Sequence, residues 1–146
     1  MVISIGSDHG GYKLKEEIKA YLLNKGYEVI DNGCHSTESV HYPLYADMVS
    51  KDVQSARANY GILVCTSGIG MAISANKHKG IRAAVIREKL EARLCKEHNN
   101  CNIISFGEKF TQLSVVTECI DTFLATEFAG GRHQIRVDMI NSQEGN

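Results

Sequence analysis

The chain has 146 residues, of which 43% are apolar, and a formal net charge of −1. A chain of this length forms one domain and can bury about 70% of its unfolded surface without a disulfide or a metal. The mixed charges exclude a strongly basic nucleic-acid-binding surface, and no apolar run approaches the ~20 residues of a membrane span. The first residues do not form a signal peptide, and the five cysteines include no CxxC pair. We therefore expect a cytoplasmic protein with free thiols.

Short β-branched runs alternate with amphipathic segments along the whole chain. The predicted strands cover residues 2–5, 28–31, 60–64, 81–86 and 102–106. The predicted helices cover residues 12–25, a segment beginning at Pro43, residues 68–77 and 89–97, and a segment from Leu113 to Phe123. This alternation predicts one α/β domain over residues 1–146. We expect a three-layer αβα sandwich around a five-stranded parallel sheet, Rossmann-like or flavodoxin-like.

The apolar stripes indicate which helix faces meet the sheet. In the first helix the stripe is Leu14, Ile18 and Leu22, with Lys15 and Lys19 elsewhere on its surface. The corresponding residues of the second and fourth predicted helices are Ala46, Val49, Val53 and Ala56, and then Leu90 and Leu94.

A further helix is expected over residues 132–142, with Ile135 and Met139 on one face. It lies beyond the complete α/β unit, in a tail formed by residues 128–146. Such a tail either packs on its own domain or reaches a partner chain.

The most informative stretch is Cys65–Gly70, which follows a predicted buried strand and begins a predicted helix. Ligands of open α/β sheets bind at the carboxyl ends of strands. The backbone N–H groups of Ser67, Gly68, Ile69 and Gly70 would surround a helix N-terminus, which favours anions and thiolates. Cys65 is therefore a candidate nucleophile or proton acceptor, although free cysteines are often inert core residues.

Two familiar phosphate-binding sites do not fit this stretch. Cysteine phosphatases place an arginine six positions after the cysteine, where this chain has Met71. A Walker loop requires Gly-Lys-Ser/Thr at the start of the helix, and Gly70-Met71-Ala72 does not match it. Any phosphate must therefore be neutralised by groups from elsewhere in the chain.

Candidate partners for Cys65 lie in three other segments. Asp8 and His9 follow the first strand at the same predicted edge of the sheet. Arg132 and Arg136 are spaced i, i+4, so a helix places both on one face, where they form either a phosphate site or a solvated basic surface. His98 precedes the fifth strand and is a candidate general acid or base near neutral pH.

Metal binding is not expected. Cys95, His98 and Cys101 offer only three ligands, in a register that no common zinc module uses. We expect neither a metal nor a cofactor.

Six ordered segments together resemble the type B ribose-5-phosphate isomerases, a family that includes galactose-6-phosphate and allose-6-phosphate isomerases. The segments are Gly6–Gly11 with Leu14-Lys15, Tyr42-Pro43 with Ala46, Cys65–Gly70 with Ala75-Asn76-Lys77, Gly80–Ala83, His98–Asn100 with Asn102, and Gly130–His133 with Arg136. No single motif is decisive, but their order across nearly the whole chain is specific.

The resemblance implies a role for each candidate residue. Cys65 would move a proton between C1 and C2 of the sugar, and His98 would donate a proton to the ring oxygen. Asp8, Tyr42 and Asn99 would hold hydroxyl groups, whereas His9, Arg132 and Arg136 would bind the phosphate. Residues 67–70 would supply N–H groups to the enediolate oxygen. The resemblance also implies a homodimer with shared active sites and leaves pairing into tetramers open.

The chain departs from the family pattern at two positions. The family loop usually reads Cys-Gly-Thr-Gly, whereas this chain has Cys65-Thr66-Ser67-Gly68, in which Ser67 keeps a hydroxyl for proton transfer. Lys109 stands where the family often carries a substrate-contacting arginine. The expected reaction is ribose 5-phosphate to ribulose 5-phosphate. The alternatives are a six-carbon sugar phosphate, or a non-catalytic sugar-phosphate or flavin-phosphate module; Asp8 and His9 disfavour the flavin.

Overall fold

The fold is an α/β sandwich, as expected, and the computed structural model describes residues 1–145. The strands are β1 (Val2–Ser7), β2 (Glu28–Asp31), β3 (Tyr60–Cys65), β4 (Ala83–Val85) and β5 (Ile103–Gly107). The helices are α1 (Tyr12–Asn24), α2 (Tyr42–Gln54), α3 (Ile69–Ala75), α4 (Lys89–Asn99), α5 (Leu113–Ala125) and α6 (Arg132–Asn141), and a 3₁₀ turn, η1, covers His9–Gly11. Among these described residues, no helix has both the length and the apolarity to cross a bilayer.

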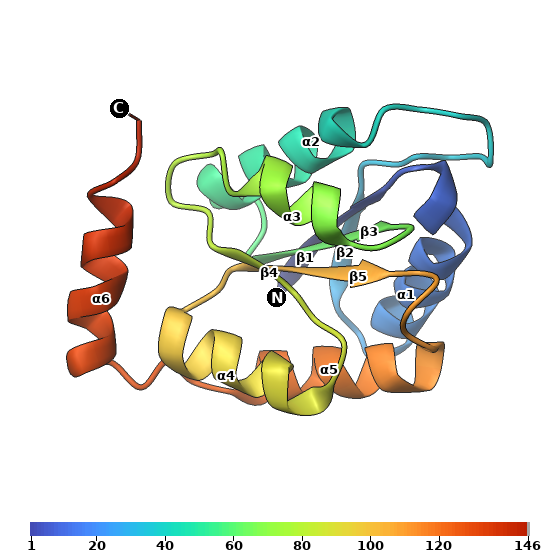
Figure 1. The fold of residues 1–146 in the computed structure, drawn as a ribbon. Helices are drawn as coiled ribbons and strands as arrows, with labels where there is room; N and C mark the ends of the chain where they lie inside the picture. Colours follow the sequence, from blue (N-terminus) through green and yellow to red (C-terminus); the bar gives the residue numbers. More distant parts are fainter. Residues whose placement is uncertain (146) are drawn as a thin grey trace.

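Helices cover both faces of the sheet, which Figure 1 shows nearly edge-on. One core joins α1, α4 and α5 to the sheet, and the other joins α2 and α3 to its opposite face. Side chains alternate along β3, so Ile62 and Val64 enter the first core while Leu63 and Cys65 enter the second.

All strand pairs are parallel, in the order β2-β1-β3-β5-β4. The last two strands are therefore exchanged relative to the flavodoxin order 2-1-3-4-5. The register pairs Ser7 with Val64 and Cys65 with Gly107. The ends of β1, β3 and β5 thus meet at one edge of the sheet, on either side of Cys65.

Several predicted boundaries shift for local reasons. Gly68 has φ +78°, outside the helical region, so α3 begins at Ile69 rather than at residue 68. The second helix ends at Gln54, and Ala56 is exposed with φ +61°, so its assignment to the apolar stripe was wrong. In α4, Ala92 and Cys95 face the core, whereas Leu90 is 51% exposed, so the predicted stripe there was also wrong.

The C-terminal helix α6 stands at the amino edge of the sheet. In Figure 1 the arrowheads of β3 and β5 point away from it. It is attached to its own chain through Val137, which is 3% exposed, while Ile135 and Met139 are 64% and 61% exposed. The tail therefore packs on its own domain by one face and leaves its predicted apolar face uncovered.

Lys15 is completely buried, contrary to its expected place on the surface of α1. Its Nζ donates to both carboxylate oxygens of Asp31, at 2.8 and 2.9 Å. Asp31 also accepts from the Gly33 N–H at 2.9 Å and from Lys19. Burial by itself would raise the pKa of Asp31, but these hydrogen bonds outweigh it and lower the pKa. The apolar periodicity of α1 did not predict the burial of Lys15, because its partner, Asp31, belongs to β2.

Asp31→Asn is expected to destabilise the protein by about 3–5 kcal/mol at pH 7, because the Lys15 ammonium would remain buried without a carboxylate. The pKa of Asp31 is lowered in the folded state, so the wild-type advantage is complete above the unfolded value of about 4 and declines as the pH falls below it. Urea unfolding at pH 7 and pH 3 measures this difference. The matched control is Glu16→Gln, since Glu16 is half-exposed and its carboxylate lies 3.8 Å from the same Nζ; it should cost less than ~1 kcal/mol. Equal effects of the two changes would contradict the prediction.

Candidate active site

The segment Cys65–Gly70, here called the cysteine loop, turns the end of β3 into α3. The Gly68 N–H donates to Sγ of Cys65 at 3.1 Å, and the Ile69 N–H donates to the Ser67 hydroxyl at 3.2 Å. The Cys65 side chain is 5% exposed. The loop thus directs a backbone N–H at the sulfur, at the carboxyl end of a central strand.

The far side of the cysteine loop is fixed by β5. The Ser105 hydroxyl, completely buried, donates to the Gly68 carbonyl at 2.7 Å. The N–H groups of Glu108 and Lys109 donate to the carbonyls of Cys65 and Thr66 at 2.9 and 3.2 Å. Sequence reasoning missed Ser105, because only the parallel β3–β5 register brings it to this turn. Lys109 is exposed, and its N–H attaches it to the loop at Thr66.

Asp8 and Tyr42 border the cysteine loop from two other parts of the chain, and Asp8 lies near Thr66 of the loop. A methyl group at Gly70 would lie 2.7 Å from ring carbons of Tyr42, so the phenol ring rests directly on the start of α3. A methyl group at Gly10 would lie 2.4 Å from the Thr66 hydroxyl and 3.4 Å from an Asp8 carboxylate oxygen. The predicted side chains from β1, α2 and β3 therefore converge on one place.

In Asp8 and in His9, one side-chain atom accepts a hydrogen bond from a backbone N–H. Asp8 is 8% exposed, and its Oδ1 accepts from the Gly11 N–H at 3.0 Å. Nδ1 of His9 accepts from the Val40 N–H at 3.1 Å. In neutral His9 the proton is therefore on Nε2, which is free to donate to an anion. The second carboxylate oxygen of Asp8 can accept a hydroxyl.

The other predicted residues gather around α6. The rings of His98 and His133 stack at a centroid distance of 4.4 Å and an interplanar angle of 7°. Burial, then His98, Arg132 and Arg136 lower the pKa of His133. His98, Arg132, His133 and Arg136, which come from α4 and α6, are here called the basic cluster. Sequence reasoning gave His133 no role, although it adjoins Arg132 in the motif.

The basic cluster and the cysteine loop lie at opposite edges of the sheet in one chain. α4 ends at Asn99, just before β5 begins at Ile103, whereas Cys65 pairs with Gly107 at the other end of β5. The strand between Ile103 and Gly107 spans ~13 Å at ~3.3 Å per residue. One chain therefore brings Asp8, His9, Tyr42 and residues 65–70 together, and it does not bring His98, Asn99, Arg132 or Arg136 to them.

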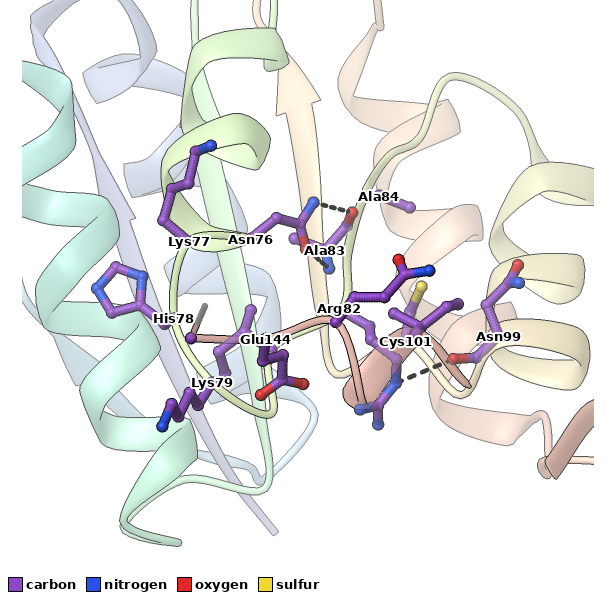
Figure 2. A pocket seen from close by; sticks show the side chains of 14 residues that line it. Asn76, Lys77, His78, Lys79, Arg82, Ala83, Ala84, Asn99, Cys101 and Glu144 are labelled. Atoms are coloured by element: carbon purple, nitrogen blue, oxygen red, sulfur yellow. Dashed lines mark hydrogen bonds between the residues drawn. The ribbon is translucent and has the colours of Figure 1, made fainter. Parts of the chain in front are cut away.

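A groove of about 690 Å³ lies at the amino edge, between the end of α6 and the segment from Asn76 to Ala84. Figure 2 shows Arg82 on its floor beside Asn99 and Cys101. This groove is on the basic-cluster side of the sheet, and Cys65 does not line it.

The remaining cysteines are buried and unpaired, and none belongs to the cysteine loop. Burial raises the pKa of Cys119 to about 11. A hydrogen bond with Cys101, together with burial, raises the pKa of Cys95. These thiols are core residues. Among residues 1–145, no three His, Cys, Asp or Glu side chains gather into a metal site.

Comparison with known proteins identifies the fold and the family together. The model of the ribose/galactose isomerase family matches residues 3–140. The chain belongs to this family. Ribose-5-phosphate isomerase B of Escherichia coli is 42% identical over 97% of this chain and 95% of its own length. The structure of Clostridium thermocellum ribose-5-phosphate isomerase B superposes with a TM-score of 0.96 at 48% identity, covering 97% and 96% of the two chains.

The family also contains relatives named for a six-carbon sugar. Galactose-6-phosphate isomerase subunit LacB of Clostridium acetobutylicum is 41% identical over 88% of this chain and 74% of its own length. In this ribose/galactose isomerase, the cysteine loop, Asp8 and Tyr42 form one half of the candidate active site, and the basic cluster lies apart from it.

Gly70→Ala is expected to lower kcat/KM at least ~10-fold, because a methyl group would push the Tyr42 ring out of the candidate site. Stability should change little, since Gly70 lies within α3 and alanine favours helix. The control is the same change in a Tyr42→Ala background, where the ring that the methyl group would displace is absent, so a small further effect is expected. Steady-state kinetics of the four proteins measures this coupling, and additive losses would contradict the prediction.

Proposed function

We propose that this chain is an aldose–ketose isomerase that interconverts D-ribose 5-phosphate and D-ribulose 5-phosphate through an enediolate. The observation that carries the proposal is the Cys65 thiol at the carboxyl end of a central strand, where it accepts from the Gly68 N–H, in a chain of this family. Relatives and solved structures named ribose-5-phosphate isomerase B align over nearly its whole length.

The proposed proton transfer uses the cysteine loop. The Cys65 thiolate removes the proton from C2 of the open-chain aldose and returns it to C1. Negative charge then develops on the carbonyl oxygen, and amides of residues 67–70 are the donors that stabilise it. The Ser67 hydroxyl, which accepts from the Ile69 N–H, carries a proton between the two sugar oxygens.

The proposed sugar contacts involve both halves of the site. Asp8 and Tyr42 hold hydroxyl groups beside the cysteine loop, and Asn99 holds another. His98 donates a proton to the ring oxygen when the furanose opens. Since the phosphate is remote from C1 and C2, its binding energy can align the reacting carbons without taking part in the chemistry.

The phosphate contacts are His9, Arg132 and Arg136. With Nδ1 of His9 accepting from Val40, the Nε2–H can donate to an anion, and two arginines one helical turn apart suit a phosphate group. Thr66 belongs to the cysteine loop, and Lys109 lies next to it, with its N–H donating to the Thr66 carbonyl. Lys109 keeps the positive charge of an arginine there but lacks its planar fork, so it makes a single point-charge contact.

The separation of the two halves leads us to propose a homodimer in which each active site takes its basic cluster, with Asn99, from the partner chain. Several apolar side chains remain exposed around both halves: Leu44 and Met48 on α2, Ile69 and Ile73 on α3, and Ile135 and Met139 on α6. An isologous contact of α6 with the partner's α3 would cover these side chains. The tail 128–146 then packs on both chains. Five free buried thiols suit a reducing compartment, so we place the reaction in the cytoplasm.

Cys65→Ala is expected to lower isomerisation of ribose 5-phosphate by ~10³-fold or more, because the base is lost, while binding of the sugar phosphate persists. A coupled assay on ribose 5-phosphate, allose 6-phosphate and galactose 6-phosphate, together with calorimetric titration, measures both. Cys119→Ala, at a buried thiol of α5, is the control and should keep kcat. Near-normal turnover by Cys65→Ala would remove the base assignment.

The same assay identifies which sugar phosphate is the preferred substrate. The relative named for galactose 6-phosphate keeps a six-carbon substrate as the second candidate. Faster turnover of either hexose phosphate than of ribose 5-phosphate would favour that candidate. A wild-type protein that binds ribose 5-phosphate without isomerising any of the three would indicate a non-catalytic module.

The shared site is tested by mixing two inactive chains. In a heterodimer of Cys65→Ala with His98→Ala, one site combines an intact cysteine loop with an intact basic cluster, so about half the wild-type activity should return. Co-expression with two different tags isolates the heterodimer. A heterodimer as inactive as its two parents would mean that each chain forms its site alone.

A further inference from the structure

Arg82, on the segment that precedes β4, connects the two elements of the basic cluster. Its Nε donates to the carbonyls of Asn99 and Asn100, each at 3.1 Å, and Nη2 donates to Asn100 at 2.9 Å. Its Nη1 donates to the side chain of Asn141, at the end of α6, at 3.3 Å. Figure 2 shows the guanidinium group beneath Asn99.

The contacts with α4 form a C-terminal cap. The last carbonyls of an α-helix have no partner within the helix, and they carry the negative end of its dipole. Asn100 adopts a left-handed conformation with φ +46°, which turns the chain sharply after His98 and Asn99. A guanidinium group at this turn supplies both the donors and the positive charge that the exposed carbonyls require.

The contacts with the preceding segment hold Arg82 itself in place. Its backbone N–H donates to the Asn102 side chain at 2.9 Å, and Asn102 donates in turn to the Gly80 carbonyl at 2.8 Å. The Arg82 Nη1 also lies 3.4 Å from that carbonyl. All three nitrogens of the guanidinium group therefore donate to the protein, and the group links the turn after α4 to the end of α6.

We propose that Arg82 is a positioning residue: by capping α4 and tethering α6, it sets the orientation of His98, Asn99 and the two α6 arginines toward the active site of the partner chain. Arg82 itself touches no substrate. Because it acts on the basic cluster, a change at Arg82 should impair the partner's site and leave the cysteine loop of its own chain intact. This proposal rests on the shared site proposed above.

The first test examines the basic cluster without using activity. In Arg82→Ala the stack of His98 on His133 should loosen, and the pKa of His133 should move up toward the ordinary histidine value of about 6.5. The charged and titratable groups that act on the pKa of His133 are His98, Arg132, Arg136 and Glu97. A change in their arrangement around His133 is therefore sufficient to produce the shift. NMR titration of the histidine rings measures this shift. Unchanged titration of both rings in a folded Arg82→Ala protein would overturn the proposal.

The second test asks which active site is damaged. Arg82→Ala homodimers should lose about 10- to 100-fold in kcat/KM, because the donors of the basic cluster would be displaced by about 1 Å. Arg82→Lys keeps the positive charge but lacks the planar guanidinium donors, so it should recover part of the lost kcat/KM. The matched control is Arg57→Ala, since this exposed arginine pairs with Asp52 on the amino side of β3 and should have no effect on kinetics.

Heterodimers then separate this proposal from the assembly on which it rests. Cys65→Ala paired with Arg82→Ala should regain about half the wild-type activity, as should Cys65→Ala paired with His98→Ala. Recovery with His98→Ala but not with Arg82→Ala would overturn the role of Arg82 and leave the shared site standing. If neither heterodimer regained activity, the shared site would be overturned. The proposal that Arg82 acts on the active site of the partner chain would then be overturned with it. The NMR titration would still decide whether Arg82 orients the basic cluster.

Discussion

The turn at Gly68 is the constraint on which the cysteine half of the site depends. With φ +78°, Gly68 redirects the chain from β3 into α3, and a methyl group there would lie 2.9 Å from the Phe106 backbone. This close approach lets the Gly68 N–H reach the Cys65 sulfur and lets the Ser105 hydroxyl hold the Gly68 carbonyl. The sulfur, the loop amides and the end of β5 are therefore one rigid unit.

Rigidity of this unit matters because the proposed reaction requires donors in place before charge develops. The neighbouring segments are held by a second set of contacts. Asp31 joins buried Lys15 to the Gly33 amide, at the start of the segment whose Val40 N–H fixes the His9 ring. The Lys15–Asp31 pair thus fixes the start of the segment that reaches His9. The paired carboxylate also explains why a lysine is tolerated in the core.

The parallel sheet also imposes the division of the site. Every crossover from a helix into a strand places the end of the helix at the amino edge, so His98 and Asn99 cannot share an edge with Cys65 in the same chain. α6 is attached to this same edge through the His98–His133 stack, the Ala129–Glu97 hydrogen bond and Arg82. The basic side chains are thereby gathered away from the anion they are proposed to bind, and a second copy of the chain supplies the simplest way to unite them.

The sequence by itself determined the alternation of strands and helices, the place of Cys65 at a strand end and the candidate residues Asp8 and His9, because these follow from local periodicity and from the position of strand ends. The candidate Tyr42 came only from the resemblance to the family. It also supplied the ordered motifs that indicated the family. Only the tertiary structure decided the strand order, the burial of Lys15, the support that Ser105 gives to Gly68, and the distribution of the candidate residues between two edges. These depend on contacts between residues far apart in the chain, such as Arg82 with Asn141, which no local pattern encodes.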